Sequence, residues 1–272
     1  MGEQSADVAV IGGSGFYEFL ADAEDVKVGT PYGEPSAPVS IGRLDTDAGG
    51  RSVAFLPRHG RGHAYPAHRV NYRANLWALR SCGVRQVIAP CAVGSLTPDL
   101  GPGALVVPDQ LVDRTRGREQ TYYDCGACHV GFADPYCPRL RRHVLGASRD
   151  QGEDMVDGGA MVVVEGPRFS TRAESQWYAA QGWTLVNMTG HPEAVLAREL
   201  AMCYAAVALV TDVDAGVDAE HAVDQAAVFR VFGENTERLR SLLHEVVASV
   251  PAERECPCPH ALDGMQLPVE LP

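Results

Sequence analysis

The 272-residue chain is long enough for one large domain or two small ones, and 46% of its residues are hydrophobic and 21% are charged. This composition is typical of a globular protein and excludes a disordered or fibrous one. The 35 acidic residues outnumber the 23 Lys and Arg residues and give a net charge of −12, so we expect neither a nucleic acid nor an anionic membrane as a partner, because both require a basic surface.

Strands and helices alternate along the chain, which predicts an α/β domain. Hydrophobic patterning predicts, in order, strands at 8–11 and 53–56, a helix at 71–82, strands at 87–89 and 105–107, a helix at 137–145, a strand at 161–164, a helix at 171–180, a strand at 184–186, a helix at 191–204, a strand at 206–210 and a long helix at 223–250. Residues 1–250 form one predicted domain. Residues 251–272, with five prolines and two cysteines, form a predicted extended tail.

Two predicted strands end in segments that favour anion binding. A GGSG segment follows the first strand, where backbone N–H groups and the Ser14 hydroxyl can face an anion. It lacks the third glycine of a dinucleotide-binding loop and the lysine of a Walker loop. Arg58 and His59 follow the strand at 53–56, and a guanidinium matches the geometry of phosphate oxygens. Taken singly, each segment is explained as well by a tight turn or a surface loop.

Two further strands also end in polar groups: one adds a hydroxyl to the predicted anion pocket, and the other carries two carboxylates suited to a protonatable ligand that donates hydrogen bonds. Asn187 and Thr189 follow the strand at 184–186, and Asp212 and Asp214 follow the strand at 206–210. Carboxylates two residues apart on a strand point to the same side, and ligands of α/β proteins bind near the carboxyl ends of strands. Together the four strand ends predict an enzyme that transfers a sugar from a basic leaving group to phosphate.

Eight segments carry a resemblance to the 5'-methylthioadenosine phosphorylase branch of the trimeric purine nucleoside phosphorylase family. In family order they are VIGGSGFY, PRHGRGH, VNYRANLWALRSCGVRQVI, AVGSL, DQLVDRTRGR, EGPRFSTRAES, NMTGHPEAVLARE and ALVTDVDAG. The resemblance implies one α/β domain around a central mixed, partly closed β-sheet flanked by helices, assembled as a homotrimer. It also implies phosphorolysis of 5'-methylthioadenosine, and of other 5'-modified adenosines, to adenine and a 5-modified ribose 1-phosphate.

The resemblance further implies roles for individual residues. The implied phosphate-binding residues are Ser14, Arg58, His59, Cys91, Ala92 and Thr189. The implied nucleoside-binding residues are Met188 at the ribose, Phe169 and Ser170 at the purine, Asp212 and Asp214 at N7 and N6 of adenine, and His63 and His129 near the 5' substituent. His129 is expected from a neighbouring subunit. Asp212 is the expected acid at N7, and Asp214 its catalytic partner at N6.

The sequence departs from the family pattern at several of these positions. Ser14 and Cys91 stand where threonine is expected, and a thiol is a weaker hydrogen-bond donor than a hydroxyl. Gly190 and His191 replace a Thr-Val pair, and Gln225 occupies an apolar position of the 5' pocket. These departures leave the contact from the Cys91 side chain to phosphate in question.

Three classes of function stay open on these residues. A phosphorylase is the leading interpretation. A nucleosidase that uses water would not need an Arg-His pair beside the small-residue loops, and a nucleoside or phosphate sensor would bind without turnover. Among phosphorylases, an enzyme for 6-oxopurine nucleosides such as inosine or 5'-methylthioinosine is the alternative.

The eight cysteines are expected to be free thiols in the cytoplasm. Residues 125–129 match the C-x-x-C-H pattern of covalent haem attachment, which normally requires export. We expect no export and no membrane span, because the apolar run at 8–11 is short and follows acidic rather than basic residues. Cys256, Cys258 and His260 are candidate zinc ligands, yet their C-x-C spacing fits poorly and zinc would need a second cysteine pair. We therefore expect no metal and no cofactor, with inorganic phosphate as a co-substrate.

Overall fold

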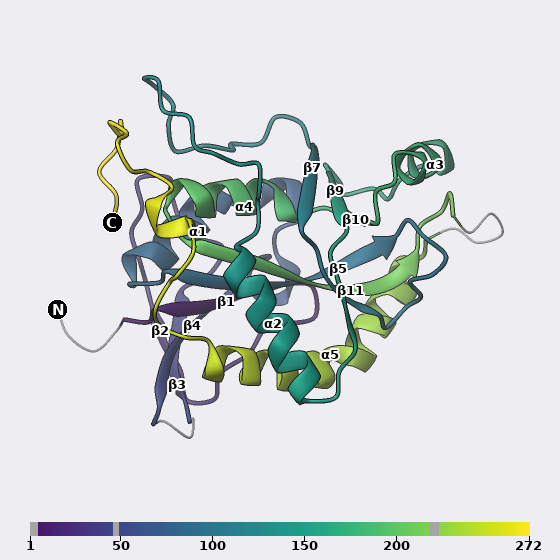
Figure 1. Cartoon of the computed structure of the whole chain (residues 1–272), viewed down its shortest axis with the longest axis horizontal. Coiled ribbons are helices and arrows are strands. Elements are labelled where there is room, and N and C mark those ends of the chain that lie inside the picture. Colours follow the sequence, from purple (N-terminus) through teal and green to yellow (C-terminus); the bar gives the residue numbers. More distant parts are fainter. Residues whose placement is uncertain (1–4, 46–48, 218–222) are drawn as a thin grey trace.

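An 11-stranded mixed β-sheet with helices on both faces forms the centre of the computed structural model, which describes residues 5–45, 49–217 and 223–272 (Figure 1). The strands are β1 (Val8–Gly12), β2 (Glu24–Val26), β3 (Val39–Leu44), β4 (Arg51–Pro57), β5 (Gln86–Ser95), β6 (Leu105–Val107), β7 (Gln110–Arg114), β8 (Met155–Asp157), β9 (Ala160–Val164), β10 (Leu185–Asn187) and β11 (Cys203–Val213). The helices are α1 (Tyr72–Ser81), α2 (Pro138–Asp150), α3 (Arg172–Ala180), α4 (Gly190–Glu199) and α5 (Gln225–Ser249), with short 3₁₀ turns η1 (Arg61–His63), η2 (Ala67–Arg69) and η3 (Cys258–His260). Within these described ranges, no helix has the length and apolar character needed to span a membrane.

The sheet forks at its central strand, β5. Near its start β5 lies between β1 and β11 and runs parallel to both, whereas near its end antiparallel β10 takes the place of β1. The branches continue from β1 to β4, β3 and β2, from β10 to β9 and β7, and from β11 to β6 and β8. The predicted α/β domain with a mixed sheet and flanking helices is confirmed. The sheet is unclosed rather than partly closed, because the branches diverge from β5 and no pairing among the described strands rejoins them.

Neighbouring residues of the central strands face two different hydrophobic cores. In β1, Val8 and Val10 belong to the core formed with α2 and α5, while Ala9 and Ile11 belong to the core formed with α1 and α4. The two helix pairs therefore cover opposite faces of the sheet, as Figure 1 shows. This double coverage explains why the central strands are continuous apolar runs in the sequence.

All five predicted helices are present, and the largest difference is at the end of α4. The prediction continued this helix to residue 204, but α4 ends at Glu199 and β11 begins at Cys203. Ala201 stops the helix with a left-handed φ of 51°, and the Met202 N–H closes the last turn on the Ala197 carbonyl at 2.9 Å. Glycine is the usual residue at such a position, so an alanine there gave no stop signal in the sequence.

Four strands were missed by the sequence patterns: β2, β3, β7 and β8. Three of them, β2, β7 and β8, form the outer ends of the sheet branches and carry exposed polar side chains. A strand that is covered on one side only has a short or broken apolar pattern, which explains why these were not recognised.

The C-terminal segment 251–272 contains η3 and no other helix or strand. It is packed against the domain: Cys258 is buried in the core beside α2 and α5, and Val269 and Leu271 pack against the core on the other face. The segment therefore reaches from one helix layer of the domain to the other.

Candidate active site

A pocket of about 290 Å³ lies at the carboxyl ends of β1, β4, β10 and β11, beside the second half of β5. Its volume is at the lower end of the range for small-molecule sites. Every predicted site residue except His129 lines it: Ser14, Arg58, His59, His63, Cys91, Ala92, Phe169, Ser170, Met188, Thr189, Asp212 and Asp214. His129 is exposed and lies outside the pocket of its own chain.

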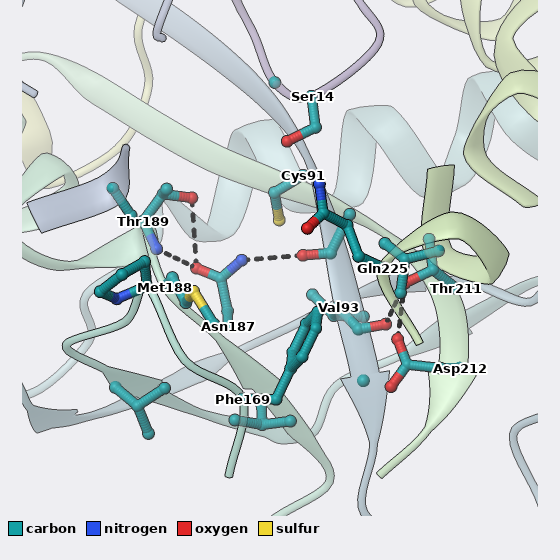
Figure 2. Close-up of a pocket in the computed structure, with 18 of the residues that line it drawn as sticks. Ser14, Cys91, Val93, Phe169, Asn187, Met188, Thr189, Thr211, Asp212 and Gln225 are labelled. Carbon is teal, nitrogen blue, oxygen red and sulfur yellow. Dashed lines mark hydrogen bonds between the residues drawn. The ribbon is translucent and has the colours of Figure 1, made fainter. Parts of the chain in front are cut away.

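The pocket has two chemically different ends. Figure 2 shows Ser14, Cys91 and Thr189 on one side and Asp212 on the opposite side. The side chain of Phe169 lies between them in this view. One end therefore carries hydroxyl, thiol and backbone groups, and the other carries carboxyl groups, with apolar surface between.

Asn187 holds the Thr189 loop in place. Its side-chain oxygen accepts hydrogen bonds from the backbone N–H groups of Thr189 and Gly190, both at 2.7 Å, and its amide donates to the Ala92 carbonyl at 3.0 Å (Figure 2). The Thr189 hydroxyl also donates to Asn187, at 3.3 Å. Asn187 thus takes the place of a helix cap at the start of α4 and leaves the Thr189 hydroxyl free to rotate toward a better acceptor.

Arg58 is fixed by a buried ion pair. Its Nε and Nη2 donate to the Glu193 carboxylate at 2.6 and 2.8 Å, and both side chains are almost fully buried. The Tyr204 hydroxyl donates to the same carboxylate at 2.7 Å. Burial disfavours the charge on Arg58, but Glu193 outweighs burial and raises the pKa of the guanidinium. The remaining nitrogen, Nη1, lies next to Gly13 and donates to the Pro90 carbonyl at 3.3 Å.

His59 and His63 are stacked neutral imidazoles at the edge of the pocket. Their ring centroids are 4.2 Å apart and their planes differ by 10°. Burial, Arg58 and His63 lower the pKa of His59 to about 3, and burial lowers the pKa of His63. His59 Nδ1 lies 2.9 Å from the Tyr65 carbonyl, which can only accept, so this nitrogen carries the proton. The Nε2 atom of His59 is therefore a hydrogen-bond acceptor.

Cys91 is a neutral thiol in this environment. It is 4% exposed, and burial raises its pKa to about 12. A neutral thiol donates weakly, so its side chain adds little to anion binding. Ala92 lines the same part of the pocket. Its backbone groups do not depend on whether residue 91 is the cysteine of this chain or the threonine expected from the family.

Asp212 owes its position to a bulge in β11. The pairing of β11 with β5 shifts at Thr211, so that Asp212 pairs with Gly94. The Thr211 hydroxyl lies 2.8 Å from Asp212 Oδ2, to which it donates, and 3.2 Å from the Val93 carbonyl (Figure 2). Burial and Asp214 raise the pKa of Asp212 to about 6, against the effect of the Thr211 hydroxyl. Asp212 can therefore act as an acid near neutral pH.

Asp214 presents a buried oxygen that lacks a partner within the described chain. The residue is 2% exposed, and its Oδ2 atom has no hydrogen-bond partner there. Burial raises the pKa of Asp214, although the Ser175 hydroxyl and the Ala215 amide oppose it. A buried polar atom without a partner is costly, and here it lines a ligand-sized pocket. It is therefore suited to binding a polar atom of a ligand.

A third part of the lining comes from η1 and α5. Gln225, the first residue of α5, lines the pocket together with Val228 and Phe229. His63 lies edge-on to Phe229 with ring centroids 6.2 Å apart, and the Tyr17 hydroxyl lies 3.2 Å from His63 Nδ1. This part of the pocket therefore combines apolar surface with the polar groups of His63 and Gln225.

Three supporting residues had no role in the sequence analysis: Glu193, Arg118 and Thr211. Arg118 donates to the backbone carbonyls of Met188 at 2.9 Å and Glu165 at 2.8 Å, so it joins two loops that border the pocket. Glu193 and Arg118 lie in two of the eight segments that carry the family resemblance. For Glu193 the available signal was a charged residue inside a helix whose other residues are mostly buried. Neither contact was visible without the fold.

The lining residues offer no set of metal ligands. Among the described residues, one group of metal-ligating side chains is close enough to share an ion, namely Cys137, Cys203, Cys256 and Cys258. None of the four lines the pocket.

Comparison with known proteins places the chain in a family. The family model described as "Phosphorylase superfamily" matches residues 7–249. The S-methyl-5'-thioadenosine phosphorylase of Mycolicibacterium smegmatis is 60% identical, over 97% of this chain and 99% of that protein. A purine nucleoside phosphorylase of Streptomyces coelicolor is 56% identical, over 98% of both chains.

A solved structure agrees with these relatives. The methylthioadenosine phosphorylase of Schistosoma mansoni in complex with adenine superposes with a TM-score of 0.86 and 38% identity, covering 92% of this chain and 93% of that one. The α/β domain is thus shared with these relatives in fold as well as in sequence. The chain belongs to the phosphorylase superfamily.

Proposed function

We propose that this chain is a pentosyltransferase that cleaves 5'-methylthioadenosine with inorganic phosphate, giving adenine and 5-methylthioribose 1-phosphate. The observation that carries the proposal is the pair of buried carboxyl groups at one end of the pocket: Asp212, with a pKa of about 6, and Asp214, with an oxygen that lacks a partner. The relatives named above as S-methyl-5'-thioadenosine phosphorylases support the same substrate.

The carboxyl end of the pocket matches adenine. Adenine has a donor at N6 and an acceptor at N7, so Asp214 accepts from N6 and protonated Asp212 donates to N7. As the C1'–N9 bond breaks, its electron pair passes to the purine and Asp212 delivers its proton to N7. Neutralising the leaving base in this way lowers the barrier to its departure.

The hydroxyl end of the pocket matches phosphate. A phosphate oxygen forms the new bond to C1' while Ser14, Thr189 and the backbone at Ala92 donate to the other oxygens. His59 Nε2 accepts a hydrogen bond from the proton of hydrogen phosphate and stays neutral, because the pKa of His59 is about 3. The phosphate passes that proton to solvent as it becomes an ester. That proton replaces, through solvent, the one that Asp212 gives to adenine, so the reaction is balanced. Positioning and oriented donors supply most of the catalysis.

The direct role of Arg58 is narrower than the sequence implied. Two of its three nitrogens are used by Glu193, which leaves Nη1 to face phosphate. Arg58 therefore contributes mainly an oriented N–H donor at Nη1, because Glu193 holds the guanidinium in place and neutralises its charge.

An enzyme for 6-oxopurine nucleosides is less compatible with this pocket. The oxygen at position 6 of hypoxanthine is an acceptor and would face the unpartnered oxygen of Asp214. A site built to accept a hydrogen bond discriminates strongly against a group that cannot donate one.

The proposal includes a homotrimer that acts in the cytoplasm in methionine salvage. The position of His129 supports the assembly, since an exposed residue outside its own pocket is what a donor to a neighbouring pocket requires. Light scattering during gel filtration tests it: a trimer is expected, and a monomer with full activity would contradict it.

The central test is release of adenine from 5'-methylthioadenosine by phosphate-free enzyme, with and without added phosphate. We expect release to depend strictly on phosphate and the sugar product to be the 1-phosphate. Release that is indifferent to phosphate would identify a nucleosidase, and binding without release would identify a sensor. Inosine and 5'-methylthioinosine serve as matched substrates, and a preference for either would refute the assignment of adenine.

A further inference from the structure

Four cysteine thiols meet at one point of the domain, away from the pocket. The Sγ atoms of Cys137, Cys203, Cys256 and Cys258 all lie within 4.8 Å of one another. The Sγ atoms of Cys203 and Cys256 are 3.5 Å apart. The four come from three separate parts of the chain: the start of α2, the start of β11 and the C-terminal segment.

We propose that these four cysteines bind one structural zinc ion. Zinc prefers four tetrahedral ligands in structural sites, with Zn–S bonds of about 2.3 Å, which places the sulfurs about 3.8 Å apart. The observed spacing brackets this value, so small side-chain rotations complete the site. The sequence analysis rejected zinc because Cys256 and Cys258 had no second pair, and the fold supplies that pair as Cys137 and Cys203.

The surrounding backbone holds the first two ligands in place. The Cys137 N–H donates to the Tyr204 carbonyl at 2.8 Å, which ties the start of α2 to the residue after Cys203. The Leu140 N–H donates to Cys137 Sγ at 3.4 Å. Hydrogen bonds of this kind orient metal-bound sulfur and offset its negative charge.

Charge balance also favours a metal at this position. Four thiolates and Zn²⁺ carry a net charge of −2, and Cys137 caps the positive N-terminal end of the 13-residue helix α2. Arg139, in the first turn of that helix, has buried Nε and Nη1 atoms without a hydrogen-bond partner in the described chain. Each thiol that binds the ion releases its proton to solvent.

Packing of thiols as small apolar groups is the competing explanation. Buried cysteines are common in hydrophobic cores, and Cys82 and Cys91 are buried here outside the cluster. Packing does not require thiols from three segments to share one centre, whereas metal binding does. Cys256 is partly exposed, which gives an ion a route to the otherwise buried site.

The site would attach the C-terminal segment to the domain and take no part in the reaction. With four protein ligands the ion has no open position for substrate, and none of its ligands lines the pocket. Because Cys256 and Cys258 are the ligands from the segment after α5, the ion would fix residues 251–272 across α2 and β11.

Metal analysis of the full chain, purified with reductant and without a metal-affinity step, tests the proposal. We expect about one zinc per chain, and less than a tenth of that in the C256S/C258S double variant. Cys82→Ser and Cys125→Ser are the matched controls, one buried and one exposed, and both should keep the zinc. The double variant should keep its turnover of 5'-methylthioadenosine at low temperature and melt at a lower temperature.

Cobalt gives a second readout that does not depend on activity or on the variants. Wild-type protein refolded with Co²⁺ should show the thiolate-to-cobalt charge-transfer band and the visible bands of tetrahedral cobalt. Wild-type protein that contains no zinc would overturn the proposal. Thiol titration of the denatured protein would then show whether the eight cysteines are free thiols or form disulfides, and either result would stand against zinc. Zinc that persists in a folded C256S/C258S variant would overturn it as well.

Discussion

Replacing Thr211 by valine should raise the pKa of Asp212 and shift the pH dependence of the reaction. The Thr211 hydroxyl donates to Asp212 Oδ2 at 2.8 Å and thereby favours the carboxylate over the acid. Valine has nearly the same shape and cannot donate. The variant therefore removes one hydrogen bond from the charged form of Asp212 and leaves burial and Asp214, which raise its pKa, in place.

The size of the shift follows from the strength of that bond. A hydrogen bond to a charged group contributes about 1.5–3 kcal/mol, and the lower value applies because the Val93 carbonyl lies within 3.2 Å of the same hydroxyl. At about 1.4 kcal/mol per pH unit, the pKa should rise by about one unit. Since Asp212 must be protonated to act, activity is retained below its pKa, which is about 6 in the wild type, and is lost as pH rises through it.

The assay is kcat/KM for 5'-methylthioadenosine against pH, which reports groups of the free enzyme. Phosphate also titrates in this range, but it does so identically in every variant, so the comparison between variants isolates Asp212. Thr211→Ser is the control that keeps the hydroxyl, and its alkaline limb should coincide with that of the wild type. An alkaline limb that Thr211→Val leaves in place, or moves to lower pH, would refute the assignment of Asp212 as the acid.

Three other substitutions test the rest of the pocket. Thr189→Val should raise the KM for phosphate about tenfold and leave the KM for 5'-methylthioadenosine unchanged, because one hydrogen bond to an anion is lost; equal changes in both constants would contradict a phosphate contact. Arg58→Ala should lower the free energy of unfolding by about 3–5 kcal/mol in denaturant titrations, because Glu193 is left buried and unpaired. In the Arg58→Ala, Glu193→Gln double variant, the loss of unfolding free energy should be smaller than the sum of the losses in the two single variants. Gly94→Ala should reduce kcat on 5'-methylthioadenosine without unfolding the protein, because a Cβ there would lie 2.9 Å from Val186 Cγ1 and 3.0 Å from Asp212 Oδ1 and would move both side chains. Unchanged kcat would show that the positions of these two lining residues are not critical.

Part of the pocket could be predicted from the sequence because several of its residues lie in or just after the last residues of buried strands. An apolar run marks where a strand lies, although β5 and β11 continue beyond their predicted runs to Ser95 and Val213. Parallel strands bring their carboxyl ends to one edge of the sheet. Ser14, Arg58 and Asp212 were found in this way, and the structure places all three in one pocket. The signal was local: a short apolar run followed at once by a polar or glycine-rich segment.

Contacts between distant segments could not be predicted in this way. The bonds from Arg58 to Glu193 and from Thr211 to Asp212 depend on how α4 packs and on a bulge in β11, and neither feature has a local pattern. The cysteine cluster is a further case. Cys137 and Cys203 are far from Cys256 and Cys258 in the sequence, and the four come together because the C-terminal segment packs beside the starts of α2 and β11.

The charges in the pocket are compatible with the phosphate co-substrate that we propose for this acidic protein. Arg58 is the only cation among the described lining residues, and Glu193 neutralises it. His59 and Cys91 are uncharged at neutral pH. The phosphate end therefore offers oriented dipoles rather than net positive charge, and such dipoles stabilise charge at the positions where they point and little elsewhere. An anion that lacks the geometry of phosphate gains little from this end, so selectivity follows from the fixed positions of the Thr189 loop and the backbone at Ala92.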